Sequence, residues 1–193
     1  MRKAAFPESD KLEKAHALVD WKSIKLKKKS QAVKLKKAGM KLDLGGIAKG
    51  YAVDEVYAIL KDAGLGISLV DGGGDLVLGD APPEKEGWTI EVPAYSFPED
   101  EQKDLLVLKN CSVATSGDTY RYVELEGVRY SHIIDPRSGL GISKRRMLTV
   151  IASNGMTADA LASVFSILGK QEEQKIRKRY KDASIKVRVI EWP

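Results

Sequence analysis

The sequence has few of the residues and patterns on which several protein classes depend. Its 193 residues include one cysteine and two histidines, and a single cysteine excludes an internal disulfide framework and a cysteine-based metal cluster. No apolar run approaches the roughly 18–20 residues that span a bilayer. The N-terminal stretch MRKAAFPESDKLEK lacks the apolar segment of a signal peptide. With 43% hydrophobic and 31% charged residues, the composition is that of an ordinary globular protein.

Aromatic residues are scarce where the positive charge gathers. Much of the net charge of +5 comes from one group of lysines: Lys22, Lys25, Lys27, Lys28, Lys29, Lys34, Lys36 and Lys37. Apolar residues alternate with these lysines, as in a hairpin with one solvated face, and no aromatic side chains are interleaved to stack on bases. We therefore expect no nucleic-acid partner and read the lysines as protection of edge strands. Weak attraction to anionic partners stays an alternative.

Hydrophobic periodicity predicts a single α+β domain over residues 1–193, with a largely antiparallel sheet and packed helices. The predicted helices cover residues 8–21, 46–63, 157–168 and 171–180. The predicted strands cover residues 23–26, 32–36, 67–70, 76–78, 88–92, 105–109, 112–114, 120–125, 128–130, 147–152 and 184–190. In the second helix, apolar residues recur at helical spacing, at Ala52, Val56, Ile59, Leu60 and Ala63. Gly64 is placed to end this helix.

The stretch LDLGGIAKGYAVD, residues 42–54, contains an acid, Asp43, a glycine pair, Gly45 and Gly46, and then Lys49 in the first turns of the predicted helix. A glycine pair entering a helix lets backbone groups approach a ligand closely. The positive end of that helix attracts anions such as phosphate, and Lys49 adds charge there. The alternative is a tight turn into a helix with a surface lysine.

Asp159 and Ser163 lie four residues apart in the predicted helix 157–168, so they share one face of it. A carboxylate and a hydroxyl together offer hard oxygen ligands suited to Mg²⁺ or Ca²⁺. The remainder of the helix is apolar, which argues against a simple solvated face. The alternative is that Asp159 supports the start of its own helix.

Two glycine-rich stretches and one histidine complete the candidates. Residues 71–75 and 115–118 are predicted turns at strand ends, which either present backbone N–H groups to anions or are only turns. His132, beside a predicted hairpin and close to Asp135, could act as a general base near neutral pH, or could be structural.

Taken in order, the motifs LDLGGIAKGYAVD, VDGGGDL, ATSGD, YSHIIDPRSG and TADALAS resemble those of the ApbE family, the FAD:protein FMN transferases. The resemblance runs from about residue 41 to residue 169 and implies an ApbE-like, T-fold-like α+β fold. Family members split the pyrophosphate of FAD with a divalent metal, usually Mg²⁺. They transfer FMN to a threonine hydroxyl of an acceptor flavoprotein and release AMP, and some members hydrolyse FAD instead.

The resemblance also implies roles for individual residues. FAD would contact Asp43, Lys49 and the backbone of Ile133, while the metal would be held by Asp159, Ser163 and the backbone carbonyl of Gly46. His132 would lie near the acceptor hydroxyl, so His132 and Asp159 are the expected catalytic residues. The pocket would be shaped by the glycine turns, that is by Gly73, Gly74, Thr115, Ser116 and Gly117.

This chain departs from the family pattern in two respects. Members usually have threonine where this chain has Ser163, and they carry a further segment before the first motif, including parts that cover the flavin and adenine. An FAD pyrophosphatase and a non-catalytic flavin-binding module therefore stay open as alternatives. The resemblance favours an extracytoplasmic location, often through a lipid anchor, although this chain shows neither an anchor nor a signal.

Overall fold

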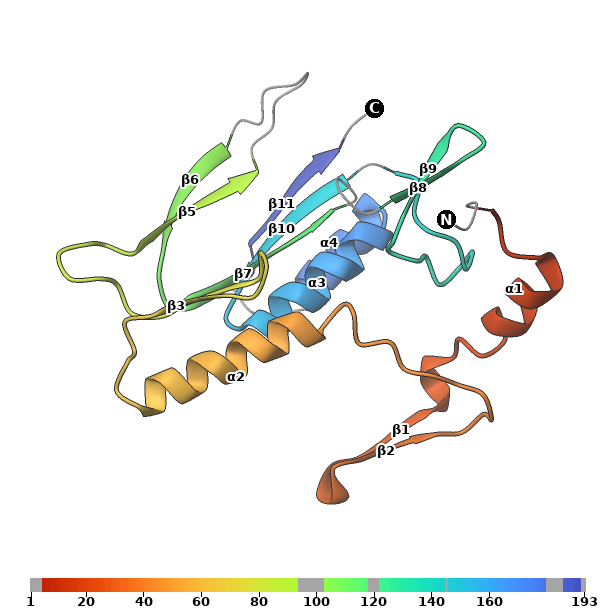
Figure 1. Ribbon diagram of the computed structural model, residues 1–193, viewed down its shortest axis with the longest axis horizontal. Helices are drawn as coiled ribbons and strands as arrows, with labels where there is room; N and C mark the ends of the chain where they lie inside the picture. The colour runs from red at the N-terminus through yellow and green to blue at the C-terminus, as the bar shows by residue number, and fades with distance from the viewer. Residues whose placement is uncertain (1–4, 94–102, 118–121, 145, 180–185, 192–193) are drawn as a thin grey trace. The chain divides into compact units, whose positions relative to one another are not determined.

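The computed structural model describes residues 5–93, 103–117, 122–144, 146–179 and 186–191 (Figure 1). The chain forms two compact units, one of residues 1–43 with 121–143 and the other of residues 44–120 with 144–193. The single domain that the sequence suggests over residues 1–193 stays a prediction. Residues 118, 120, 121, 180, 184 and 185, at the ends of predicted elements, lie outside the described part of the chain.

The described residues of the first unit form one short α-helix, two 3₁₀ turns and two hairpins. Its elements are α1 (Ser9–His16), the 3₁₀ turns η1 (Trp21–Ser23) and η2 (Lys28–Ser30), β1 (Ile24–Lys27) with β2 (Ala32–Leu35), and β8 (Tyr122–Leu125) with β9 (Val128–Ser131). Both strand pairs are antiparallel. The lysine-rich hairpin predicted from the alternating pattern is therefore confirmed.

The first helix is shorter than the predicted segment 8–21 because Asp20 begins a different local structure. Its carboxylate accepts hydrogen bonds from the backbone N–H of Lys22 at 3.1 Å and from the Ser23 hydroxyl at 2.7 Å. A side-chain oxygen that binds the amide two residues on starts a new turn. Trp21, the last residue of the predicted segment, lies outside α1 and is 76% exposed.

The second unit contains a five-stranded antiparallel sheet in the order β11-β10-β7-β4-β3. The strands are β3 (Leu69–Asp71), β4 (Leu76–Leu78), β7 (Cys111–Gly117), β10 (Arg146–Ala152) and β11 (Lys186–Glu191), and a separate hairpin pairs β5 (Trp88–Pro93) with β6 (Lys103–Leu108). The helices are α2 (Ala48–Asp62), α3 (Gly155–Ile167) and α4 (Lys170–Arg179). The predicted α+β fold with antiparallel sheets is confirmed.

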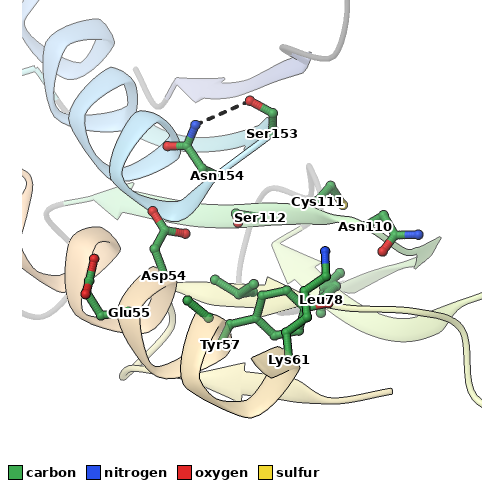
Figure 2. Close-up of a pocket in the computed structure, with 12 residues that line it drawn as sticks. Asp54, Glu55, Tyr57, Lys61, Leu78, Asn110, Cys111, Ser112, Ser153 and Asn154 are labelled. Atoms are coloured by element: carbon green, nitrogen blue, oxygen red, sulfur yellow. Dashed lines mark hydrogen bonds between the residues drawn. The ribbon is translucent and has the colours of Figure 1, made fainter. Parts of the chain in front are cut away.

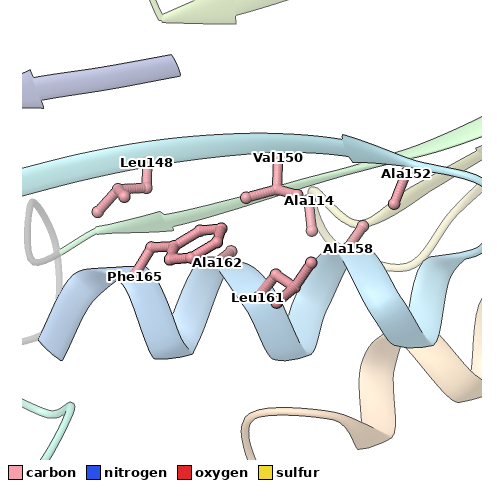
Figure 3. Packing of buried hydrophobic residues seen from close by; sticks show 8 residues of the cluster. All are labelled: Ala114, Leu148, Val150, Ala152, Ala158, Leu161, Ala162 and Phe165. Carbon is pink, nitrogen blue, oxygen red and sulfur yellow. The ribbon is translucent and has the colours of Figure 1, made fainter. Parts of the chain in front are cut away.

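The main core of this unit lies between α3 and the central strands (Figure 3). Its fully or almost fully buried members are Ala114, Leu148, Val150, Ala152, Ala158, Leu161, Ala162 and Phe165. The alanines of α3 let the helix approach the sheet closely, and Phe165, 0% exposed, fills the remaining space. Burial of one such side chain stabilises the fold by about 1.5–3 kcal/mol. A second cluster, on Leu78, Ile90, Val92 and Val113, joins the β5–β6 hairpin to the sheet.

Helix α2 forms where the sequence predicts it, and Gly64, at φ +81°, follows its end as expected. The side that it buries was not predictable from its apolar residues. The buried positions are Gly50 and Val53, whereas Val56 and Ile59 are 46% and 68% exposed. The reason is a close crossing with α3, which only a residue without a side chain allows. Among the described helices, none is long and apolar enough to cross a membrane.

Candidate functional site

The site is built around the crossing of α2 and α3, where Gly50 meets Gly155. A Cβ on Gly50 would overlap the carbonyl group of Gly155, and a Cβ on Gly155 would lie 2.6 Å from the carbonyl oxygen of Gly50. Such distances are too short for any side chain, so the two backbones are in direct contact. This contact brings residues from the beginning of α2 next to residues from the first turns of α3.

Asp159 lies at this crossing and is 6% exposed. Its Oδ2 accepts a hydrogen bond from the backbone N–H of Gly50 at 3.1 Å. Helix α3 has its own cap, because the side chain of Asn154 accepts from the backbone N–H of Thr157 at 2.8 Å. Asp159 therefore caps α2. The alternative considered from the sequence, that Asp159 supports the start of its own helix, is wrong. Helix α2 needs this cap, since Ile47 at its N-cap position makes no side-chain bond.

Gly46 and Ser163, the two other predicted metal ligands, are also brought together. A Cβ on Gly46 would lie 3.0 Å from the Ser163 Oγ, so the backbone that enters α2 lies directly against this hydroxyl. The three residues offer oxygen atoms of three kinds: the carbonyl of Gly46, the carboxylate of Asp159 and the hydroxyl of Ser163. These are the donors that hard divalent cations prefer, and the residues fit such an ion.

Acidic and histidine side chains alone do not supply this metal site. Among the residues that the structure describes, no group of three or more histidine, cysteine, aspartate or glutamate side chains is placed to hold a metal ion. Any cation at the crossing would need the Gly46 carbonyl, the Ser163 hydroxyl and oxygen atoms from substrate or water. A site completed by substrate phosphates is typical of Mg²⁺.

Lys49, predicted as an anion-binding residue, forms an ion pair that the sequence did not indicate. Its Nζ lies 2.8 Å from Oδ2 of Asp75, and the Lys49 side chain is half exposed while that of Asp75 is almost fully buried. Burial raises the pKa of the Asp75 carboxyl above its usual value, Lys49 opposes this effect, and the charges of Asp159 and Asp71 add to it. Asp75 therefore holds the ammonium group of Lys49 at the start of α2. In the sequence, only the position of Asp75 in the motif VDGGGDL could have suggested that it belongs to the site.

The glycine turn between β3 and β4 does not offer its amide groups freely. The backbone N–H groups of Gly73 and Gly74 donate to Oδ1 of Asp71, at 2.9 and 2.8 Å. Both glycines have positive φ, +79° and +94°, a conformation that L side chains rarely adopt. The structure thus favours the alternative that this segment is a turn, whose role is to place Asp75.

Thr115, Ser116 and Gly117 do not form the turn that the sequence predicts. They continue strand β7 and pair with Thr149, Leu148 and Met147 of β10. Gly117 lies against Met147, whose Cγ would be 3.3 Å from a Cβ added to the glycine. The hydroxyls of Thr115 and Thr149 are 3.0 Å apart and hydrogen-bonded. Strand β7 pairs with β4 only as far as Val113. Residues 115–117 therefore pair with β10 on one side and extend beyond β4 on the other.

Three predicted site residues belong to the first unit. Asp43 and His132 are exposed, and His132 directly follows β9. Ile133 uses both of its backbone groups within the unit: its N–H donates to the Ser131 Oγ at 3.2 Å, and its carbonyl accepts from Ile142 at 2.9 Å. Asp135, near His132 in sequence, binds the Arg137 guanidinium, which lowers the pKa of that carboxyl.

A pocket of about 430 Å³ lies in the second unit, between the middle of α2 and strand β7 (Figure 2). Its walls include Asp54, Tyr57 and Lys61 of α2 and Ser112 of β7. None of the site residues predicted from the sequence lines it. The residues proposed to bind the metal and the pyrophosphate are therefore not part of this pocket.

Comparison with known proteins identifies relatives along most of the chain. The sequence pattern of the ApbE family matches residues 1–187. The FAD:protein FMN transferase of Treponema pallidum (strain Nichols) is 33% identical over 184 residues, which make up 88% of this chain and 51% of that protein. The FAD:protein FMN transferase of Vibrio cholerae is 36% identical over 131 residues, or 67% of this chain and 39% of that protein. The chain spans about half the length of these relatives or less.

Solved structures share the fold. The crystal structure of the ApbE protein from Thermotoga maritima aligns with a TM-score of 0.81 at 31% identity, covering 97% of this chain and 60% of that one. The flavin transferase ApbE from Vibrio cholerae aligns with a TM-score of 0.83 at 26% identity, covering 99% of this chain and 59% of that one. The resemblance read from five sequence motifs is confirmed, and the chain belongs to the ApbE family.

Proposed function

We propose that this chain carries the metal- and pyrophosphate-handling part of an FAD:protein FMN transferase. The substrate is FAD, the acceptor is a threonine hydroxyl of a flavoprotein, and the second product is AMP. The observation that carries the proposal is the convergence of Gly46, Asp159 and Ser163 at the crossing of α2 and α3. The names of the two transferases that are 33% and 36% identical to this chain support the same reaction.

We propose a divalent cation, Mg²⁺ in the first instance, held by the Asp159 carboxylate, the Ser163 hydroxyl and the Gly46 carbonyl. When bound, this ion neutralises charge on the pyrophosphate oxygens and makes AMP a better leaving group. The protein contributes a buried carboxylate with a fixed orientation. The Gly50 N–H donates to one oxygen of Asp159. This bond fixes the orientation of the carboxylate before any ion binds.

Lys49 would stabilise the negative charge that develops on the pyrophosphate in the transition state. A lysine on a flexible stem is a poor electrostatic catalyst unless its ammonium group is held in place, because reorientation costs free energy at the moment of reaction. The ion pair with Asp75 supplies that restraint. The Lys49 side chain is half exposed, and an ammonium group has three donors, so one ion pair does not use all of them.

In the transfer step, the acceptor Oγ forms a bond to the phosphorus of the FMN half. The bond from that phosphorus to the bridging oxygen breaks, and AMP leaves with the bridging oxygen. The hydroxyl proton needs an acceptor near neutral pH, a task suited to histidine. We propose His132 for this role on the strength of its motif, YSHIIDPRSG.

The proposal is tested with the chain, FAD, Mg²⁺ and a flavoprotein acceptor that contains the target threonine. Mass spectrometry of the acceptor should show a covalent FMN on threonine and an equal amount of AMP in solution. Free FMN with AMP would instead support the pyrophosphatase alternative. Bound but intact FAD would support the non-catalytic flavin-binding module and contradict the proposal. Asp159→Asn, which removes the charge, is the matched inactive variant.

A further inference from the structure

Asp54, a residue with no role in the proposed reaction so far, lies in the second turn of α2 and binds the start of α3. Its Oδ1 accepts from the backbone N–H of Gly155 at 2.6 Å, and its Oδ2 accepts from that of Met156 at 2.8 Å. With Asn154 bonded to Thr157, the first three amide groups of α3 all have partners. A carboxylate at a helix N-terminus forms strong, charge-assisted hydrogen bonds.

This contact is the counterpart of the one made by Asp159. Asp54 lies four residues after Gly50 in α2, and Asp159 lies four residues after Gly155 in α3. Each helix therefore has one glycine at the crossing and, one turn later on the same face, one carboxylate that accepts from the first turn of the other helix. Asp159 binds one amide, that of Gly50, and Asp54 binds two, those of Gly155 and Met156. We call this arrangement of Gly50, Asp54, Gly155 and Asp159 the double clasp.

The double clasp bears on the metal site because the proposed ligands come from both sides of it. Gly46 precedes α2, whereas Asp159 and Ser163 lie in α3. A shift of α3 along α2 would move the carboxylate and the hydroxyl away from the Gly46 backbone. Metal affinity is sensitive to such shifts. Mutation of a residue that orients a metal ligand typically reduces the affinity 10–100-fold.

We propose that Asp54 is a positioning residue for the metal site: by holding the start of α3 on α2, it places Asp159 and Ser163 opposite Gly46. The proposal rests on the proposed metal site, and it adds a residue that does not touch the ion or the substrate. Asp54 lines the pocket of Figure 2, which contains none of the proposed metal ligands. Its effect on metal binding would therefore be indirect, through the position of α3 on α2.

The chain offers a matched control in Asn154. Asn154→Ala also removes a hydrogen bond to an N-terminal amide of α3, but it leaves the contact between the two helices intact. If Asp54 did no more than stabilise α3, then Asp54→Ala and Asn154→Ala would weaken metal binding equally, provided that they destabilise the protein equally. Asp54→Asn supplies a conservative variant, because its single carbonyl oxygen can replace one of the two lost acceptors.

The test uses Mn²⁺ alone as the probe, with free ion measured by electron paramagnetic resonance at a temperature where all variants are folded by circular dichroism. We expect Asp54→Ala to weaken Mn²⁺ binding by about tenfold or more, Asp54→Asn by less, and Asn154→Ala by less than twofold. Equal weakening in Asp54→Ala and Asn154→Ala, or no weakening in Asp54→Ala, would overturn the positioning role. Absence of Mn²⁺ binding by the wild-type chain would overturn the metal site and the positioning role together.

Amide exchange separates the double clasp from the metal. In metal-free protein, Asp54→Ala should accelerate exchange at Gly155 and Met156, which lose their direct acceptor. If the clasp couples both helices, exchange should also accelerate at Gly50, whose acceptor is Asp159, and Asn154→Ala should leave Gly50 unchanged. Protection of Gly50 that persists in Asp54→Ala would show that the two contacts are independent and would overturn the inference even where Mn²⁺ binds normally.

Discussion

Lys49 and Asp75 form an ion pair in which the cation is half exposed and the carboxylate is almost completely buried. The pair joins the first turn of α2 to the turn between β3 and β4. Burying a carboxylate is costly, and the attraction of a partly exposed lysine offsets only part of that cost. The raised pKa of Asp75 is the net result, so this residue serves the site at some expense of stability.

The cost of Asp75 should depend on pH in a defined direction. Its pKa in the folded state lies above the unfolded value of 3.8, so the folded state binds more protons between these two values and loses stability as pH rises through them. Asp75→Asn removes this loss. We expect the variant to gain stability relative to wild type between pH 3 and pH 7, as measured by urea denaturation at each pH.

A control for this experiment is Asp62→Asn, which removes an exposed carboxylate from the end of α2. The comparison of the two variants separates the effect of the buried carboxylate from the loss of one negative charge. A stability difference between Asp75→Asn and wild type that is independent of pH would show that burial does not disfavour the ionised form of Asp75. FAD cleavage by Asp75→Asn should fall, because Lys49 loses its restraint.

The crossing of α2 and α3 predicts an unusual response to alanine. Replacing a helical glycine by alanine normally stabilises a helix by about 0.5–1 kcal/mol. At Gly50 the added methyl group would overlap the Gly155 carbonyl, so we expect a loss of about 1–3 kcal/mol in the free energy of unfolding. Denaturant unfolding of Gly50→Ala measures this loss.

Gly46→Ala is the natural comparison for Gly50→Ala. Its methyl group would meet the Ser163 hydroxyl at 3.0 Å, and a side chain can move where a backbone cannot. The variant should lose less stability than Gly50→Ala but should bind metal more weakly, since Ser163 is displaced. Equal stability of Gly50→Ala and wild type would contradict the close crossing.

Asp159 accepts a hydrogen bond from Gly50 and is our proposed metal ligand, and two substitutions separate these two roles. Asp159→Asn keeps an oxygen to accept the Gly50 N–H but removes the charge, so it should remain folded and lose metal-dependent FAD cleavage. Asp159→Ala also leaves the Gly50 amide without its acceptor, at a cost of about 1–3 kcal/mol in stability. Thermal unfolding and AMP release, measured on both variants, test this separation. Full cleavage activity in Asp159→Asn would refute the ligand role.

The first unit should respond to acid through Asp20. Hydrogen bonds from Ser23 and Lys37 are the largest causes that lower the pKa of this carboxyl from 3.8 to about 2. The folded value is depressed, so the stabilisation is present above pH 3.8 and is lost as pH falls through about 2. The amide signal of Lys22, whose N–H donates to Asp20, should shift in NMR spectra with a midpoint near pH 2. A midpoint near 4 would contradict these bonds.

The sequence was sufficient to predict most elements because their periods and end signals are local. The α2 helix and its end at Gly64 follow from spacing and one glycine. The buried side of α2 could not be predicted, because a glycine that makes a close helix crossing outweighed an apolar stripe containing Val56 and Ile59. The strand at Thr115–Gly117 was missed because a glycine next to small polar residues is also typical of a turn.

For the site, the sequence pointed to the residues that we propose as metal ligands, but it did not reveal the residues that hold them in place. Asp159 and Ser163 share a helix face, which spacing reveals, and Gly46 and Lys49 stand in a recognisable motif. Asp75 and Asp54 act through contacts between residues far apart in the chain, and no local pattern contains such contacts. The matching spacings GYAVD and GMTAD were a usable signal, since each places an acid one turn after a glycine.

The most direct test of the central claim is AMP release from FAD by the wild-type chain, with Mg²⁺ and with a chelator. Chromatography of the nucleotide products measures AMP and remaining FAD in the same sample. The account predicts AMP with Mg²⁺, none with chelator, and none from Asp159→Asn in either condition. AMP release that persists in chelator, or intact FAD with a folded wild-type chain in Mg²⁺, would contradict a metal-dependent site at the crossing of α2 and α3.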